Sequence, residues 1–206
     1  MKNMAAVLAV FVSGYSCIAN AAPITSLQTT VIAMPALNID FATGVYTQAP
    51  GITWSGDGGA FGSTQVYYFG TNGFWSGSPP YAAVNSDEGS MQFSFAQPVS
   101  AVGGLINYST GDESLPVISI YNSSNQLLES SQLSFSTDGT GEFHGFQLAN
   151  PLISSFRLSG SYMALRNLTI LASSPLAPVP EPETYAMLLA GLGLMATVAR
   201  RKRPLP

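Results

Sequence analysis

The sequence has few charged residues, few basic residues and a single cysteine. Of its 206 residues, 9% are charged, against about 25% in typical soluble domains, so the high net charge of an intrinsically disordered chain is absent. Lysine and arginine together number 7, which is too few for the basic clusters that neutralise nucleic-acid phosphates. The composition therefore argues against a disordered chain and against a nucleic-acid-binding protein.

The single cysteine, Cys17, lies in the N-terminal segment that we expect to be removed on export. The mature chain would then have no thiol, no disulfide and no thiolate metal site, and we expect it to need no cofactor. Its stability must come from apolar burial and hydrogen bonds.

The basic residues lie mainly at the two ends of the chain. Between residues 22 and 178, nine acidic residues and only two arginines, Arg157 and Arg166, give a formal net charge of −7. The two ends therefore differ in chemistry from the middle, and we interpret both ends as segments that interact with a membrane. The basic residues at the ends are Lys2, Arg200, Arg201, Lys202 and Arg203.

Residues 1–21 have the pattern of a secretory signal peptide. Lys2 precedes an apolar run from Met4 to Val12, and small residues follow at Ala19 and Ala21, as in an A-x-A cleavage site. We predict export by the Sec machinery and cleavage after Ala21. The alternatives are an uncleaved N-terminal anchor and a lipoprotein site at Cys17.

The C-terminus has a linker, a short apolar segment and a basic end. Residues 173–178 are rich in serine and proline, and residues 185–199 carry no charge. As a helix, this apolar segment covers about 22 Å of a hydrocarbon core about 30 Å thick, so it can span a locally thinned bilayer. The basic residues 200–203 would remain cytoplasmic, as a stop-transfer signal. We predict a single transmembrane helix with the large domain outside.

The tail at residues 179–206 resembles the PEP-CTERM sorting tail of Gram-negative exported proteins. The motif is Val179-Pro180-Glu181-Pro182, and the short span and the basic end follow it in order. The resemblance implies recognition by an exosortase, a membrane cysteine transpeptidase that cuts near the motif. It also implies a transient inner-membrane precursor, delivery to the cell surface or the extracellular space, and an association with bacteria that make exopolysaccharide.

Residues 22–172 predict one all-β domain, an antiparallel β-sandwich or jelly roll, because short β-branched and aromatic stretches alternate with turn residues. The clearest stretch is Ser90 to Phe95, in which Met91, Phe93 and Phe95 point to one side. Residues 91–171 are also similar to the β-sandwich of many PEP-CTERM proteins. The other expected strands are 99–108, with a bulge or a close backbone approach at Gly103-Gly104, 116–121, 127–135, 142–148, 152–158, 162–171 and, with weaker patterns, 38–46 and 64–69.

Aromatic residues gather between Trp54 and Tyr81, within loops rich in glycine, serine and asparagine. Aromatic faces beside hydroxyl and amide groups suit the apolar faces of sugars. We therefore predict Trp54, Trp75 and Tyr81 as carbohydrate contacts; the alternatives are that these rings belong to the core or contact a protein partner.

Other candidate groups are two pairs of acids and one histidine. Asp87-Glu88 and Asp112-Glu113 lie in expected turns, where two carboxylates could serve a glycosidase and oxygen ligands at Asp112 and Glu113 could bind calcium. Solvated turns are the simpler interpretation. His144, the only histidine, lacks a Gly-x-Ser-x-Gly elbow that would suggest a serine hydrolase, so we expect an ordinary strand position for it.

We predict a non-enzymatic surface or matrix protein, exported, processed at its tail and associated with exopolysaccharide. The alternatives are a carbohydrate-active enzyme, either a glycoside hydrolase or a lyase, that uses loop carboxylates, and an adhesin that stays anchored because its tail is never cut.

Overall fold

The structure, a computed structural model, describes residues 21–110, 115–160 and 162–172. By its internal contacts the chain divides after Ala172, and every described residue lies in the first unit, Met1–Ala172. Nearly all regular structure in this part is β-strand, and every strand pair in it is antiparallel. The predicted all-β antiparallel class is therefore confirmed.

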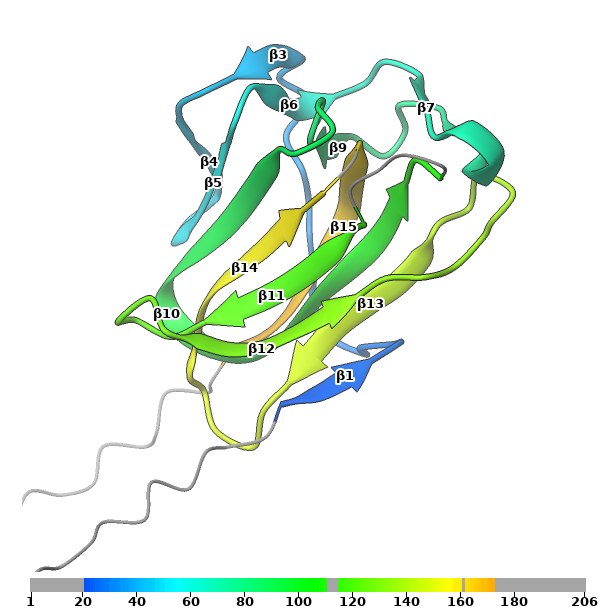
Figure 1. Cartoon of the computed structure of the whole chain (residues 1–206). Helices are drawn as coiled ribbons and strands as arrows, with labels where there is room; N and C mark the ends of the chain where they lie inside the picture. Colours follow the sequence, from blue (N-terminus) through cyan, green and yellow to red (C-terminus); the bar gives the residue numbers. More distant parts are fainter. Residues whose placement is uncertain (1–20, 111–114, 161, 173–206) are drawn as a thin grey trace, which may run out of the picture. The chain divides into compact units, whose positions relative to one another are not determined.

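The strands form two layers in a sandwich-like arrangement (Figure 1). One layer has the order β12-β11-β14-β10-β5-β4. Its strands are β4 (Val45–Ala49), β5 (Ile52–Gly56), the first half of β10 (Ser90–Tyr108), β11 (Val117–Tyr121), β12 (Leu127–Gln132) and β14 (Ile153–Ser159).

The other layer has the order β1-β13-β10-β15-β9-β6-β3, and β2 also pairs with β15. Besides the second half of β10, its strands are β1 (Ala22–Ile24), β2 (Val31–Ile32), β3 (Ile39–Ala42), β6 (Gly59–Ser63), β9 (Tyr81–Ala83), β13 (Glu142–Gln147) and β15 (Met163–Ala172). A separate hairpin of β7 (Tyr67–Tyr68) and β8 (Phe74–Trp75) encloses the 3-10 helix η1 (Gly70–Asn72).

Strand β10 belongs to both layers. Its first half pairs with β5 and β14, and its second half pairs with β13 and β15. The sequence predicted two strands separated at Pro98, but the strand is continuous. Pro98 lies where the pairing of β10 with β14 is irregular, between Ser94 and Val99, so the missing proline donor is tolerated.

The predicted bulge at Gly103-Gly104 is confirmed by a register shift between Gly103 and Leu105 in the pairing with β15. A Cβ at Gly103 would lie only 2.8 Å from the carbonyl oxygen of His144 on β13. Glycine therefore permits this close approach of two backbones.

The main core lies between the two layers. Met91, Phe93 and Phe95 are buried there while Gln92 and Ser94 face outward, as the alternation predicted. Across the layers they share one apolar cluster with Val102, Ile106, Phe146, Phe156 and Leu165. This cluster contains most of the buried apolar residues of the described part.

The weaker expected strands differ from the structure. Residues 38–46 contain the whole of β3 and the start of β4, because a bend intervenes at Gly44. Residues 64–69 contain only the two-residue strand β7, and β12 ends at Gln132 rather than residue 135.

Among the described residues no helix is long and apolar enough to cross a membrane. The predicted span 185–199 and the signal segment 1–20 lie outside the described residues.

Candidate ligand pocket

The three aromatic residues predicted as carbohydrate contacts are buried. Trp54, Trp75 and Tyr81 expose 0%, 1% and 1% of their surface. Trp54 lies between the two layers, with its ring centroid 5.1 Å from that of Phe61 and its Nε1 donating to the Met91 sulfur at 3.5 Å. A ring with no exposed face cannot stack on a sugar, so the prediction is corrected: these rings are core residues.

Trp75 and Tyr81 belong to a second apolar cluster, which we call the outer cluster. On each of the strands β6, β9 and β15, one residue belongs to the main core and its neighbour belongs to the outer cluster. The main-core residues are Phe61, Ala82 and Leu165, and their neighbours in the outer cluster are Ala60, Ala83 and Ala164. Because successive side chains of a strand point to opposite faces, the outer cluster lies on the outer face of the layer that contains β6, β9 and β15. Its members are Ala60, Phe69, Trp75, Tyr81, Ala83 and Ala164.

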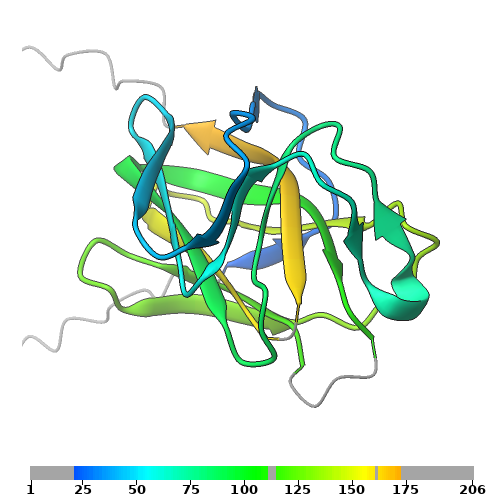
Figure 2. The same ribbon diagram turned by 90° about the horizontal axis from the view of Figure 1, so that it is seen from above.

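The segment β7–η1–β8 covers this outer face and is fixed by a buried asparagine network. Asn72 donates from Nδ2 to the Tyr108 carbonyl at 3.1 Å, and Asn107 donates to the Asn72 carbonyl at 3.1 Å. The backbone N–H of Thr137 donates to Asn72 Oδ1 at 3.1 Å. These bonds hold η1 against β10, while Figure 2 shows the segment, in teal, at one side of the domain.

A pocket of about 290 Å³ lies at the edge of the outer cluster. Its size is near the lower end of the range of about 300–1,000 Å³ that is usual for small-ligand sites, so it suits one small ring and its substituents. The lining residues come from β3, β6, β9 and the residues that follow them: Asp40, Phe41, Gly59, Ala60, Ser63, Gln65, Val66, Tyr67, Tyr81 and Asn85.

Strand pairing brings these distant residues together. Strand β3 pairs with β6, and β6 pairs with β9 so that Ser63 lies opposite Tyr81. The pairing of β3 is irregular between Ile39 and Ala42, and the two residues between them, Asp40 and Phe41, are exposed while Ala42 is buried. The irregularity therefore turns a carboxylate and an aromatic ring out to the pocket.

The side chain of Asn38 attaches the next part of the lining to β3. Its Oδ1 accepts hydrogen bonds from the backbone N–H and the hydroxyl of Thr64, both at 2.7 Å. This contact holds Thr64 in place, and thereby positions the lining residues that follow β6, beginning with Gln65.

Two tyrosines form the aromatic wall of the pocket. The rings of Tyr67 and Tyr81 meet edge to face, with centroids 5.8 Å apart. The Tyr67 hydroxyl donates to the Val84 carbonyl at 2.9 Å, and the Tyr81 hydroxyl donates to the Gln65 carbonyl at 3.1 Å. Both hydroxyls are thus used within the protein; Tyr81 is buried behind the wall, and the half-buried ring of Tyr67 is left as contact surface.

The environment of the wall strongly favours neutral tyrosines. Burial raises the pKa of Tyr67 far above its ordinary value of 10.0, and the neighbouring Tyr81 adds to the increase. Burial also raises the pKa of Tyr81; a hydrogen bond with Ser63 opposes this change, and the charge of Asp40 reinforces it. Asp40 and the two tyrosines line the same pocket.

Three polar side chains of the lining have groups without a protein partner. Among the described residues, no hydrogen bond or ion pair involves the Asp40 carboxylate, the Gln65 side-chain amide or Nδ2 of Asn85. All three residues are exposed. They offer one charged acceptor, one amide that can donate or accept, and one donor around an aromatic wall.

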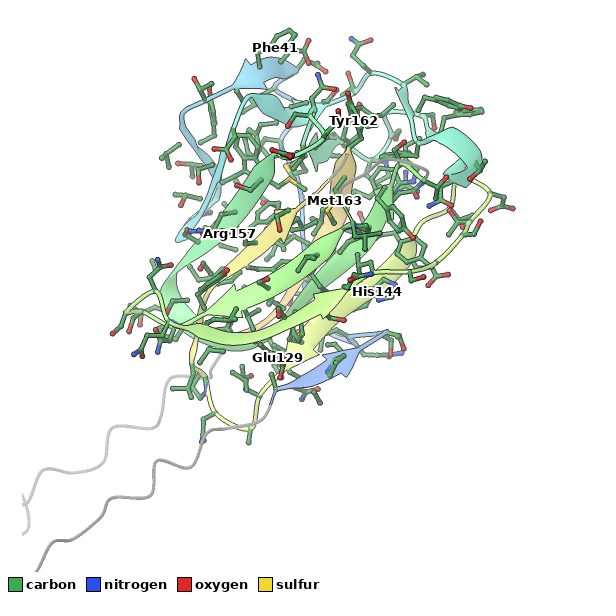
Figure 3. The ribbon with its side chains drawn as sticks, in the orientation of Figure 1. Phe41, Glu129, His144, Arg157, Tyr162 and Met163 are labelled. Atoms are coloured by element: carbon green, nitrogen blue, oxygen red, sulfur yellow. The ribbon has the colours of Figure 1, made fainter. Side chains whose placement is uncertain are left out.

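Phe41 combines high exposure with an unusual backbone. Its ring is 75% exposed and its φ is +53°, a left-handed conformation that costs a non-glycine residue free energy and is often found at ligand sites. Figure 3 shows the ring at the outer end of the domain, directed away from the sheets. A flat apolar ring at the mouth of a pocket is suited to contact with a ligand.

Sequence reasoning missed Asp40, Phe41, Gln65 and Asn85. Phe41 follows Asp40 directly, just before the turn residues Thr43-Gly44, and an aromatic ring beside an acid next to a turn is the one local signal that could have indicated it. Nothing in the sequence around Gln65 or Asn85 marks either residue, because only the strand pairing places them near β3.

His144 lies on β13, the strand position that we expected. Its ring stacks on Phe135 with centroids 4.9 Å apart, and its Nε2 lies 3.3 Å from Glu142 Oε2. No serine hydroxyl within the described part of the chain hydrogen-bonds to this ring, so these residues assemble no serine hydrolase triad around it.

The other predicted sites lie mostly outside the described residues. This holds for Asp112 and Glu113, for Ala19, for the motif Val179–Pro182 and for the basic residues 200–203. Ala21 is described; it is buried and directly precedes β1. In the ranges 21–110, 115–160 and 162–172, no group of three or more histidine, cysteine, aspartate or glutamate residues is placed to hold a metal ion.

The domain is thus an antiparallel β-domain with a small aromatic pocket at one end. Comparison with protein families matches residues 178–203 to the PEP-CTERM protein-sorting motif. The chain is therefore a protein that carries a PEP-CTERM sorting motif, as the resemblance of its tail indicated.

No curated protein matches the chain. Among solved structures it is similar to the lectin domain of lectinolysin complexed with Lewis B antigen, at 14% identity and a TM-score of 0.38, over 66% of this chain and 98% of that one. A histidine mutant of the lectin-binding domain of lectinolysin complexed with Lewis b gives 14% identity and a TM-score of 0.36, over 68% of this chain and 100% of that one.

Proposed function

We propose that this chain is an exported, exosortase-processed surface or matrix protein whose β-domain binds extracellular polysaccharide through the pocket at Asp40, Phe41 and Tyr67. It acts as a binding module and not as an enzyme. The sorting motif supports the first part of the proposal, and the pocket supports the second.

The proposed route starts from the chain's two ends. The N-terminal signal directs Sec export, the apolar segment 185–199 holds the precursor in the inner membrane, and an exosortase-type enzyme cuts near Val179–Pro182. Mass spectrometry of the protein recovered outside the inner membrane tests this route. A C-terminus that still contains Arg203 would instead indicate a permanently anchored adhesin.

The pocket supports carbohydrate as the ligand because it combines two chemistries in one small space. Phe41 and Tyr67 supply ring surface for the C–H face of a sugar, and the unpaired groups of Asp40, Gln65 and Asn85 can hydrogen-bond its hydroxyls. This combination of an aromatic wall with unpaired acceptor and donor groups is the single observation that carries the proposal.

The same pocket favours binding over hydrolysis. A glycoside hydrolase uses two carboxyl groups about 5–10 Å apart on either side of the scissile bond. Of the described residues that line the pocket, Asp40 is the one acid. These residues therefore offer no second carboxyl group on the other side of a bound sugar ring. The enzyme alternative would therefore need another site.

A glycan array tests the proposal with the full-length chain in detergent micelles. We expect binding to at least one bacterial polysaccharide fragment, and a loss of about fivefold in affinity for Phe41→Ala, because stacking on an exposed ring contributes about 1 kcal/mol. Phe74→Ala is the matched control, since Phe74 is also exposed but does not line the pocket. Absence of binding to any glycan, or equal binding by the Phe41 variant, would contradict the proposal.

A further inference from the structure

We infer that the pocket selects sugar units that carry a free amino group and rejects sugar acids. This inference rests on the proposed function and names the class of ligand for the same site. It follows from the charge of the lining, from the charges of the rest of the domain and from the aromatic wall.

Asp40 sets the charge of the pocket. It is the only ionised group at neutral pH among the described lining residues, because the remaining members are glycine, alanine, valine, amides, a hydroxyl and aromatic rings. Its carboxylate is exposed and has no protein partner among the described residues. A cationic group of a ligand would form an ion pair with this carboxylate, whereas a carboxylate of a ligand would be repelled by it.

Neither arginine of the described part is available to counter an acidic ligand. Arg157 donates from Nε and Nη2 to Gln92 Oε1 at 3.3 and 3.0 Å, and its guanidinium lies 4.9 Å from the Tyr121 ring centroid. Arg166 lies 4.3 Å from the Trp75 ring centroid and donates to the Thr140 carbonyl. Neither residue lines the pocket, so a uronic acid would bind there without a counterion.

The domain as a whole reinforces this selection. Its described residues include seven acids and only two arginines. A negative net charge attracts a cationic chain and repels an anionic one over about a Debye length, roughly 10 Å at 0.1 M salt. The long-range field and the local charge of Asp40 therefore act in the same direction.

The wall of the pocket favours an ammonium group over a neutral substituent. Phe41 and Tyr67 line the same small space as the carboxylate, and the face of an aromatic ring attracts a nearby cation. An ammonium group on a sugar can therefore contact a ring and the Asp40 carboxylate at once, while a hydroxyl or an acetamide at the same position gains only a hydrogen bond. A hexosamine unit without its acetyl group fits this description.

Calorimetric titration of the full-length chain in detergent tests the inference, with oligomers of equal length at a pH where the amine is protonated. The ligands are glucosamine, N-acetylglucosamine and galacturonate oligomers. We expect the glucosamine oligomer to bind about fivefold more tightly than the acetylated one, as an exposed ion pair allows, and the galacturonate oligomer not to bind. Added salt should reduce the preference.

Two variants separate the pocket from general charge attraction. Asp40→Asn should reduce the preference for the glucosamine oligomer to below about twofold. Glu129→Gln removes an equal charge from β12, at the opposite end of the domain from Phe41 in Figure 3, and should leave the preference unchanged. Phe41→Ala should weaken the binding of both oligomers.

The outcomes distinguish this inference from the proposed function. If no oligosaccharide binds, both fail. If binding depends on Phe41 but the acetylated or acidic oligomer is preferred, or if Asp40→Asn and Glu129→Gln have equal effects, the proposed function stands and the inference is overturned. If an oligolysine peptide binds as tightly as the glucosamine oligomer and also requires Phe41, the pocket recognises a protein ammonium group and the sugar class is overturned.

Discussion

Trp54 and Trp75 are both almost completely buried, yet they lie in different environments. Trp54 faces the main core, where residues from two layers of strands surround it. Trp75 lies in the outer cluster, where aromatic rings of the β7–η1–β8 segment pack on three alanines of one layer. The rings of the outer cluster meet edge to face: the Trp75 centroid lies 5.3 Å from that of Phe69 and 6.0 Å from that of Tyr81.

The comparison shows how one layer of strands can serve both stability and binding. The inner face of the layer is covered by the other layer, whereas its outer face is covered mainly by β7, η1 and β8, with Arg166 and Gly141 beside Trp75. Because this covering segment is short, it leaves part of the outer face uncovered, and the pocket lies at its edge beside Tyr67 and Tyr81. A region with fewer covering elements also opens more easily than the global core.

The largest effect is expected for Trp54→Ala. This change removes ring contacts with Tyr46 and Phe61, whose centroids lie 5.8 and 5.1 Å away, and leaves a cavity between two layers that cannot collapse easily. We expect a loss of about 3–5 kcal/mol in the free energy of unfolding, measured by urea denaturation. A smaller loss than for Trp75→Ala would mean that the main core does not dominate stability.

Trp75→Ala is expected to cost less, about 2–3 kcal/mol, because the covering segment can relax onto the alanines beneath it. Hydrogen exchange should show increased opening at residues 64–81, while β11 and β14 keep their protection. Uniform loss of protection across all strands would show that the outer cluster and the main core unfold as one unit.

Alkaline pH should weaken the outer cluster and its edge. Burial raises the pKa of Tyr67 and Tyr81 above the ordinary 10.0, so above that pH the unfolded chain binds fewer protons than the folded one. Stability is then fully present below about pH 10 and falls as the pH rises, by at most about 1.4 kcal/mol per pH unit for each tyrosine.

The measurement is urea denaturation at a series of pH values that crosses 10, with Tyr67→Phe as the matched variant. Removing the titrating hydroxyl should make the decline shallower, although the variant also loses the hydrogen bond to the Val84 carbonyl. An unchanged slope in the variant would show that Tyr67 does not contribute to the pH dependence.

The sequence predicted those parts of the fold that depend on neighbouring residues. The alternation at Met91, Phe93 and Phe95 is borne out by their burial. The turn at residues 122–125 is also confirmed, since Asn122 Oδ1 accepts from the backbone N–H groups of Ser124 and Gln126. In both cases the deciding interactions span four residues or fewer, so a single sequence contains them.

The pocket and the fate of the tryptophans could not be predicted in this way. Whether a ring is buried or exposed depends on which face of a strand it occupies and on what covers that face, and Trp54 and Trp75 look alike in their glycine-rich surroundings. Asp40 and Asn85 are brought together only by the pairing of β3 with β6 and of β6 with β9. Those pairings depend on the packing of the whole domain and not on local propensity.

The smallest effect, and one of opposite sign, is expected for Phe41→Gly. Phe41 adopts a φ of +53° with a ring that is 75% exposed, so the residue bears a conformational cost that little burial offsets. Glycine adopts this conformation without steric cost, and we expect the free energy of unfolding to rise by about 0.5–1 kcal/mol while glycan binding weakens as it does for Phe41→Ala. Val45→Gly is the matched control, because Val45 is also an exposed apolar residue, but it lies on β4 without a positive φ; it should lose about 0.5–1 kcal/mol. A loss of stability for Phe41→Gly as large as that of the control would mean that the ring supports the fold and is not held free for a ligand.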